Sequence, residues 1–563
     1  MNAKSQQKNR PSTLLILLLL IGIICMNLIF PLLALLRKAV DYDPFYQGFV
    51  RTLKSASTLR AIWNSVKVTF VAISVAVVFA FFYAYVVELK LGKRRRRTFR
   101  FLALLPMLVP SITHGLVIVY LFGKMGLFTR LMGFQLPIYG PLGIVLGSFF
   151  YAFPTAFLVL SQAFSNLDGR YFETAVILGT SPFRRFVDIV LPIMKYALFS
   201  AFSVCFTMIF TDYGIPLSVG GTYSILPILF YKNVIGLLNF GQGAIYSSLI
   251  LVPAVVVYLL DVGYFSKKQA SSSQNPRPID SGPFHPLQKG GFVLLTAVVL
   301  VPIAIICAAP FVRAWPYDLT LTTAHFSRIS RTGVLTRLIR TSVLVSLGTG
   351  LAGTLLAFAA GYLYVRDTGG FPWLKKLTHG LYMVSLAIPG LALGLAFALF
   401  FKGGALYNTL AILVIANVIH FFGSPYMMSI SHFKLLNPNL EVICLTLGGK
   451  WYHILFDVII PNSRQTILDI FVYFFTNSMI TISAVSLLYN VKTMTLALQI
   501  TAYNDQGTWE SAVAVSLVIL VINTVLKYWQ SRRVEKSRAR SQVLPQDIGS
   551  DVEDLVGAEA GPA

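Results

Sequence analysis

The sequence predicts an all-α membrane protein with about twelve transmembrane helices, arranged as two homologous halves of six. Hydrophobic residues make up 56% of the 563 residues and charged residues only 12%, which is about half the charged fraction of a typical soluble domain. The apolar residues gather in long runs, and a motif between two runs of the first half recurs in the second. These three observations argue against a soluble globular fold.

The apolar runs are long enough to serve as spans, because a bilayer core needs about 20 apolar residues in a helix. In the first half, runs of this length fall near 12–36, 63–88, 101–123, 140–163, 196–217 and 241–263. In the second half they fall near 291–313, 340–365, 378–401, 406–430, 466–490 and 509–529. The first run follows basic residues as a signal peptide does, but its length and the lack of a small-residue cleavage site favour a retained span.

The net charge of +24 is explained by the side of the membrane on which the basic residues lie. Most Lys and Arg residues occupy segments that alternate with the spans, and the densest run is Lys93 to Arg97. Cytoplasmic loops of membrane proteins carry such an excess. We therefore expect both termini on the inner side, with membrane lipid as the surroundings. Nucleic-acid binding is the weaker alternative, since no aromatic residues interleave the basic run, and we expect no nucleic-acid partner.

Composition divides the chain into four parts. Residues 1–263 form the first half, and residues 264–290, rich in Ser and Pro, read as a cytoplasmic linker that buries too little apolar surface to fold alone. Residues 291–530 form the second half, and residues 531–563 form a cytoplasmic tail with the composition of disorder. The four cysteines form no CxxC pair, so we expect neither a disulfide framework nor a metal site.

One loop in each half carries the repeated motif. We call residues 164–195 the first loop and residues 431–465 the second loop. Three pairs of residues recur at one offset of 269: Gly179 and Gly448, Asp188 and Asp457, Pro192 and Pro461. Glycine permits a turn between short helices, and proline is tolerated in the first turn of the next helix. We expect a helix–turn–helix at the inner membrane surface, suited to docking a soluble partner.

The first loop resembles the EAA loop of binding-protein-dependent ABC importer permeases, in which Glu-Ala-Ala, Gly and Ile-x-Leu-Pro follow at fixed spacing. Glu173, Ala175, Gly179 and Pro192 match that spacing, whereas Glu441 of the second loop lies one residue further from its glycine. The resemblance implies a type I importer permease fold in a bacterial inner (cytoplasmic) membrane. It also implies docking loops that include Glu173, Ala175, Gly179, Asp188, Pro192, Glu441, Gly448, Asp457 and Pro461.

The same resemblance implies the partners and the energy source. Two copies of a cytoplasmic ABC ATPase subunit bind the loops, and a periplasmic solute-binding protein delivers the substrate. No GxxxxGK[ST] phosphate loop occurs in the chain, so we expect ATP to be bound by the partner subunits and no cofactor or catalytic residue in this chain. The alternative from another class is a twelve-span secondary transporter driven by an ion gradient.

The resemblance extends to a narrower group of fused permeases. Residues 210–216, 220–223, 387–391 and 477–485 look like segments of permeases associated with 2-aminoethylphosphonate uptake. Fused ferric-iron permeases share the architecture. The resemblance therefore implies 2-aminoethylphosphonate as the first candidate substrate, with ferric iron as the alternative.

Three polar residues within the spans are candidates for lining the translocation path, because charge inside a membrane is costly and usually functional. Asp212 lies near the outer end of the fifth span, and His114 and His420 lie one in each half. Asp212 could attract the ammonium group of a zwitterion, or it could cap a helix or contact the following loop. Each histidine could meet a phosphonate or a metal ion, or it could donate to a helix carbonyl.

Overall fold

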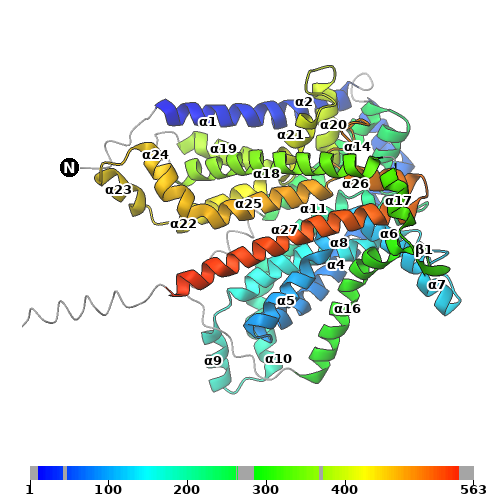
Figure 1. Ribbon diagram of the computed structural model, residues 1–563, viewed down its shortest axis with the longest axis horizontal. Helices are drawn as coiled ribbons and strands as arrows, with labels where there is room; N and C mark the ends of the chain where they lie inside the picture. The colour runs from blue at the N-terminus through cyan, green and yellow to red at the C-terminus, as the bar shows by residue number, and fades with distance from the viewer. Residues whose placement is uncertain are drawn as a thin grey trace, which may run out of the picture.

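The computed structural model describes residues 11–41, 47–261, 263, 285–331, 333–366 and 372–543. Within them the regular secondary structure is helical apart from one short β-hairpin (Figure 1). Residues 264–284 of the expected linker and 544–563 of the expected tail lie outside the described residues. The rest of the linker leads into α16, which begins at Pro286, and residues 531–543, expected to be disordered, continue α27 as helix. An all-α membrane protein is thus confirmed as the fold class.

The first half contains fourteen α-helices among the described residues. They are α1 (Pro11–Ile24), α2 (Phe30–Val40), α3 (Gln47–Lys54), α4 (Ala56–Leu89), α5 (Lys93–Leu104), α6 (Ser111–Phe122), α7 (Leu127–Met132), α8 (Pro141–Ser165), α9 (Gly169–Ile177), α10 (Pro182–Arg185), α11 (Leu191–Phe210), α12 (Gly214–Val219), α13 (Leu226–Tyr231) and α14 (Phe240–Leu260).

The second half adds the hairpin and a comparable set of helices. They are α16 (Pro286–Ala308), β1 (Val312–Ala314), β2 (Asp318–Leu321), α17 (Ala324–Arg331), α18 (Val334–Arg366), α19 (Pro372–Val384), α20 (Gly390–Phe401), α21 (Leu410–Phe421), α22 (Gly423–Leu435), α23 (Asn439–Thr446), α24 (Trp451–His453), α25 (Ile460–Ile480), α26 (Leu496–Asp505) and α27 (Trp509–Val543). The strands pair antiparallel, with Val312 opposite Leu321.

Most of the expected spans appear as long apolar helices. Among the described residues, nine helices are long and apolar enough to cross a membrane, and a pair bent by 57°, α21 with α22, makes a tenth. The expected span at 378–401 is broken between α19 and α20, and that at 466–490 ends as a helix at Ile480.

Proline explains the break at 378–401 and a similar break in the first half. Pro389 immediately precedes α20, and Pro110 immediately precedes α6, where the expected span at 101–123 is likewise divided. Proline lacks a backbone N–H and its ring clashes with the preceding turn, so a helix does not continue through it. The same break in both halves is part of the repeat.

Equivalent hydrogen bonds show that the two halves share one fold. The Ser65 hydroxyl on α4 accepts from the backbone N–H of Leu226 at 2.9 Å, where α13 begins. The Ser342 hydroxyl on α18 accepts from the N–H of Leu496 at 2.7 Å, where α26 begins. All four residues are buried. In each half, a long helix therefore holds the start of a short helix that lies far away in sequence.

The first span of each half packs on the other half. Helix α2 contacts α20, and the rings of Phe30 and Phe400 lie 6.5 Å apart. Helix α16 contacts α4 and α5, and the ring of Phe292 lies 4.8 Å from that of Tyr83. The two sequence repeats are therefore interleaved in space.

The two ends of the molecule differ. Helices α9 and α10 of the first loop and α23 and α24 of the second loop lie toward the end where α27 finishes (Figure 1). The hairpin, α7, α17 and α26 lie at the opposite end. With the basic helix α5 assigned to the inner side, both loops face the cytoplasm.

Candidate functional site

The first loop is a helix–turn–helix that turns at Gly179. Helix α9 ends where the backbone N–H of Thr180 donates to the Ala175 carbonyl at 3.0 Å and that of Gly179 to the Val176 carbonyl at 2.9 Å. Gly179 has φ +70°. This is the Schellman arrangement. A residue in the left-handed conformation turns the chain so that the N–H groups after the helix donate to its last free carbonyls.

The second loop ends its helix in the same way, at residues 269 positions later. The N–H of Gly449 donates to the Cys444 carbonyl at 2.9 Å and that of Gly448 to the Leu445 carbonyl at 3.1 Å. Gly448 has φ +79°. A Cβ at Gly179 or at Gly448 would meet nothing within 4 Å. Glycine is therefore favoured at both positions by backbone conformation and not by crowding.

The segments after the glycines also match. Helix α10 continues into a π-helical turn at Phe186–Val190, and α24 continues into one at Ile454–Ile459. Pro192 and Pro461 then stand in the first turns of α11 and α25, as expected for prolines at these sites. Asp188 and Asp457 lie in the π-helical turns with exposed side chains.

Both loops expose large apolar side chains. Leu178 is 74% exposed and Phe183 is 75% exposed in the first loop, and Leu447 is 82% exposed in the second. Leu178 and Leu447 lie outside the candidate spans, and Phe183 lies at the very start of one. Exposed apolar groups of this kind mark surfaces that bind another protein.

Aromatic contacts hold the first loop against α4. The ring of Phe164, where the loop begins, lies 5.1 Å from Phe81 and 6.0 Å from Tyr85. The ring of Phe186, in the π-helical turn, lies 6.0 Å from Phe81. Edge-to-face pairs at such distances contribute about 0.5–1.5 kcal/mol each beyond burial. The loop is thereby attached to the inner end of α4.

The second loop is attached to α18 by equivalent aromatic residues. The ring of Phe433 lies 5.0 Å from Phe358 and 5.3 Å from Tyr362. Phe358 and Tyr362 follow Phe81 and Tyr85 by 277 positions. Each half therefore uses one aromatic pair on its long helix to hold the start of its loop.

The glutamates of the two loops have different surroundings. The Glu173 side chain is exposed, whereas Ala175 is buried. Glu441 is only 16% exposed and lies 3.0 Å from the Arg366 guanidinium of α18. Burial raises the pKa of the Glu441 carboxyl, while Arg366 and the Tyr362 hydroxyl act in the opposite direction. The change of spacing at Glu441 thus accompanies a change of environment.

Asp212 acts as a helix cap in this structure. Its Oδ1 accepts from the Ser111 hydroxyl at 2.5 Å, and its Oδ2 accepts from the N–H of Ile215 at 3.0 Å. The second bond satisfies an unpaired donor in the first turn of α12. Because both carboxylate oxygens are used within the first half, the geometry matches the capping alternative.

The two histidines have different environments. His114 is fully buried, and its Nε2 lies 3.0 Å from the Pro106 carbonyl, which is the carbonyl contact that we weighed against a path-lining role. His420 is partly exposed, and its ring lies 4.5 Å from that of Phe421. Among the described residues, no three His, Cys, Asp or Glu side chains are placed to hold a metal ion.

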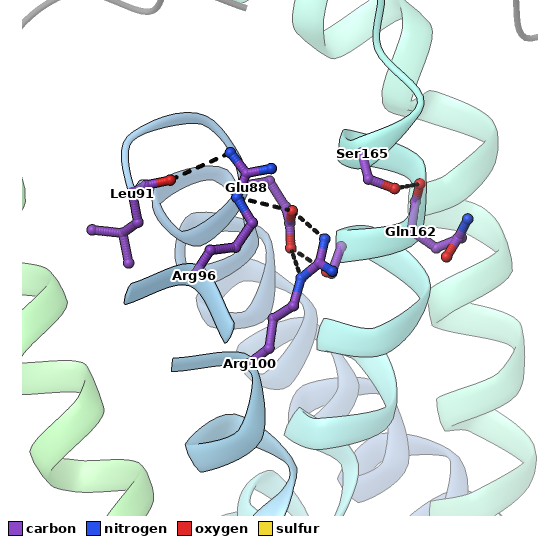
Figure 2. Close-up of polar contacts among 7 residues, drawn as sticks. Glu88, Leu91, Arg96, Arg100, Gln162 and Ser165 are labelled. Carbon is purple, nitrogen blue, oxygen red and sulfur yellow. Dashed lines mark hydrogen bonds and ion pairs between the residues drawn. The ribbon is translucent and has the colours of Figure 1, made fainter. Parts of the chain in front are cut away.

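Sequence reasoning missed a buried carboxylate beside the first loop. Glu88, whose side chain is 1% exposed, accepts from Arg100 at 2.6 Å and lies 3.8 Å from Arg96 (Figure 2). The Ser161 hydroxyl of α8 also donates to it. A lone acidic residue at the end of an apolar run, just before a basic helix, was the available signal. The network joins α4, α5 and α8 near the inner end of the first half.

Comparison with known proteins gives matches over most of the chain. The binding-protein-dependent transport system inner membrane component family matches twice, at residues 53–269 and 353–536. The ferric transport system permease protein FbpB of Actinobacillus pleuropneumoniae is 24% identical over 541 residues, covering 89% of this chain and 77% of that protein. The molybdenum transport system permease protein ModB of Mycobacterium tuberculosis is 24% identical over 244 residues, covering 42% and 90%.

The fold and the two loops define the class of protein. It is a helical membrane transport protein with two homologous halves and one cytoplasmic loop in each. The chain belongs to the family of binding-protein-dependent transport system inner membrane components, with the family domain present twice. It is accordingly a fused permease subunit of an ABC importer in the bacterial inner membrane, and such subunits work with an ATPase and a solute-binding protein.

Proposed function

We propose that each loop docks one copy of a cytoplasmic ABC ATPase subunit, so that one permease chain binds two. The observation that carries this proposal is the repetition of one exposed, glycine-turned surface in both loops. Leu178 and Leu447, which precede the turn glycines, are exposed at equivalent positions. Two surfaces built around the same turn suit two copies of one partner, since identical subunits present identical binding sites.

Closure and opening of the ATPase pair would then move the loops together and apart. Each loop is attached to a long helix by aromatic contacts, so its displacement reaches the spans. At the outer end, the halves meet where the Tyr231 hydroxyl donates to Asp505 at 3.0 Å. Motion of the loops against this outer contact provides alternating access to a path between the halves.

The docking proposal is tested by the double variant Gly179→Arg with Gly448→Arg. We expect a pull-down of the ATPase subunit by the wild-type chain to disappear in this variant. Gly133→Arg is the matched control, because Gly133 also has positive φ (+73°) and open space but follows α7 at the other end. Undiminished ATPase association in the double variant would refute docking through the loops. Uptake by the chain alone, without ATPase or ATP, would instead support an ion-coupled carrier.

We propose that the transported solute is 2-aminoethylphosphonate, with ferric iron as the second candidate. The first rests on the resemblance of residues 210–223 and 477–485 to permeases associated with phosphonate uptake. The second is favoured by the similarity to the ferric transport permease over 89% of this chain. Calorimetric titration of the partner solute-binding protein with each ligand decides between them, and tight iron binding without a phosphonate response would overturn the first candidate.

A further inference from the structure

The inner end of α18 holds the second loop at three points. The Arg366 guanidinium lies 3.0 Å from Glu441 Oε1 and also donates to the backbone carbonyl of Leu436. One turn earlier on the same face, the Tyr362 hydroxyl donates to Glu441 Oε2 at 3.3 Å, and its ring contacts Phe433. The contacts therefore reach the start of the loop, the segment before α23, and α23 itself.

The ion pair is shielded from water. The side chains of Arg366 and Glu441 are 11% and 16% exposed. Attraction between opposite charges strengthens as water is excluded, and removal of one partner leaves the other poorly solvated. A pair in this setting resists separation more than an ion pair on an open surface, so it can transmit a displacement.

The first half has the same aromatic contacts but a different residue at the position of Arg366. Phe81 and Tyr85 stand 277 positions before Phe358 and Tyr362, and the same offset places Leu89 where the second half has Arg366. Leu89 has no charge to offer a loop carboxylate. Glu88, next to it, is bound to arginines of α5. An arginine at this position of the long helix therefore occurs in the second half, where the first half has a leucine.

We propose that Arg366 and Glu441 are positioning residues that join the second loop to α18, so that loop and helix move as one unit. The inference rests on the proposed docking of an ATPase subunit at this loop. It assigns the Glu441 carboxylate a role inside the chain in place of direct contact with the ATPase. Helix α18 then carries the displacement to its outer part, where Ser342 holds the start of α26.

The link from the second loop through α18 to α26 ends at a contact between the two halves. Asp505, the last residue of α26, accepts the hydrogen bond of Tyr231 from the first half. A rigid α18 thus links a cytoplasmic loop to a contact between the halves at the outer end. Loss of the ion pair at the inner end is expected to uncouple ATP hydrolysis from opening of that contact.

The test compares single variants with a charge exchange in the complete transporter, reconstituted in proteoliposomes with its ATPase and solute-binding protein. The variants are Arg366→Ala, Glu441→Ala, Arg366→Lys and the double variant Arg366→Glu with Glu441→Arg. Solute uptake per ATP hydrolysed and ATPase association are both measured. Arg37→Ala is the control, because Arg37 pairs with Asp41 on an open surface, at 84% and 56% exposure.

We expect the two alanine variants to bind the ATPase as the wild type does but to transport about fivefold less solute per ATP, the lower range of typical coupling energies. Arg366→Lys should retain part of the coupling, the charge exchange should restore most of it, and Arg37→Ala should leave it unchanged. Restoration by exchange distinguishes a specific pair from general loss of folding.

Two results would overturn the inference. Coupling equal to wild type in both alanine variants would show that the pair transmits nothing. Loss of ATPase association in Glu441→Ala, without recovery in the charge exchange, would show that Glu441 contacts the ATPase directly. A wild-type chain that fails to bind the ATPase through its loops would instead contradict the proposed function, and the pull-down measures that separately.

Discussion

Replacement of Gly179 tests whether the first loop needs its left-handed turn or only a small side chain. Gly179 has φ +70°, and an added Cβ meets nothing within 4 Å. The cost of Gly179→Ala is therefore conformational, about 1–2 kcal/mol for a non-glycine residue in the left-handed region. If the loop relaxes when free and must be restored on binding, affinity for the ATPase falls by about 5- to 30-fold.

Asparagine separates the two explanations, because it is larger than alanine but tolerates the left-handed conformation better. Gly179→Asn should bind the ATPase more tightly than Gly179→Ala, and Gly179→Val, which is β-branched, should bind most weakly. Titration of labelled ATPase subunit onto purified permease in nanodiscs measures the affinities. The same order is expected at Gly448, where φ is +79°.

Affinities that fall in the order of side-chain size, and not of tolerance for the left-handed conformation, would refute this reasoning. If alanine binds better than asparagine at both positions, the partner needs a bare surface at the glycine, and the backbone conformation is not what limits docking. Equal affinities for all variants would mean that neither glycine contributes to the interface.

Three further predictions concern the packing around the loops and spans, each checked by thermal unfolding of the purified variant. Glu88→Ala should cost about 2–4 kcal/mol, less than a fully buried pair because its arginines can turn to water; an unchanged midpoint would contradict a structural role for the network. Gly115→Val should cost about 1–3 kcal/mol, because a Cβ there lies 2.8 Å from that of Ser218; tolerance would show that α6 and α12 separate easily. Asp212→Ala should lower the free energy of unfolding by about 1 kcal/mol through loss of the cap on α12, with the apparent KM for solute unchanged. A raised KM would instead indicate that Asp212 lines the translocation path.

The sequence predicted the features that depend on local patterns. Apolar runs mark spans because the bilayer demands about 20 apolar residues, and nine expected spans appear as long apolar helices. The geometry of the loops followed from Gly179, Gly448 and the prolines after them, since glycine and proline restrict the backbone in known ways. The repeat made each local inference stronger, because the second copy was an independent example of the first.

Features that depend on contacts between distant residues could not be predicted in this way. The separation of α19 from α20 at Pro389 was readable in principle, but an uninterrupted run of apolar residues concealed it. The pairing of Arg366 with Glu441 joins residues 75 positions apart, and hydrophobic periodicity carries no information about such pairs. The cap at Asp212 likewise depends on how closely α12 approaches α6.

The exchange of first spans between the halves has a consequence for how the chain can be assembled. Helix α2 packs on α20 and α16 packs on α4. Each half therefore contacts the other through its own first span. A chain cut between residues 263 and 285 would yield two fragments that still hold one another in this crossed manner. Covalent fusion therefore fixes the ratio of the two halves at one to one and raises their local concentration, while recognition between them is already built into the helices.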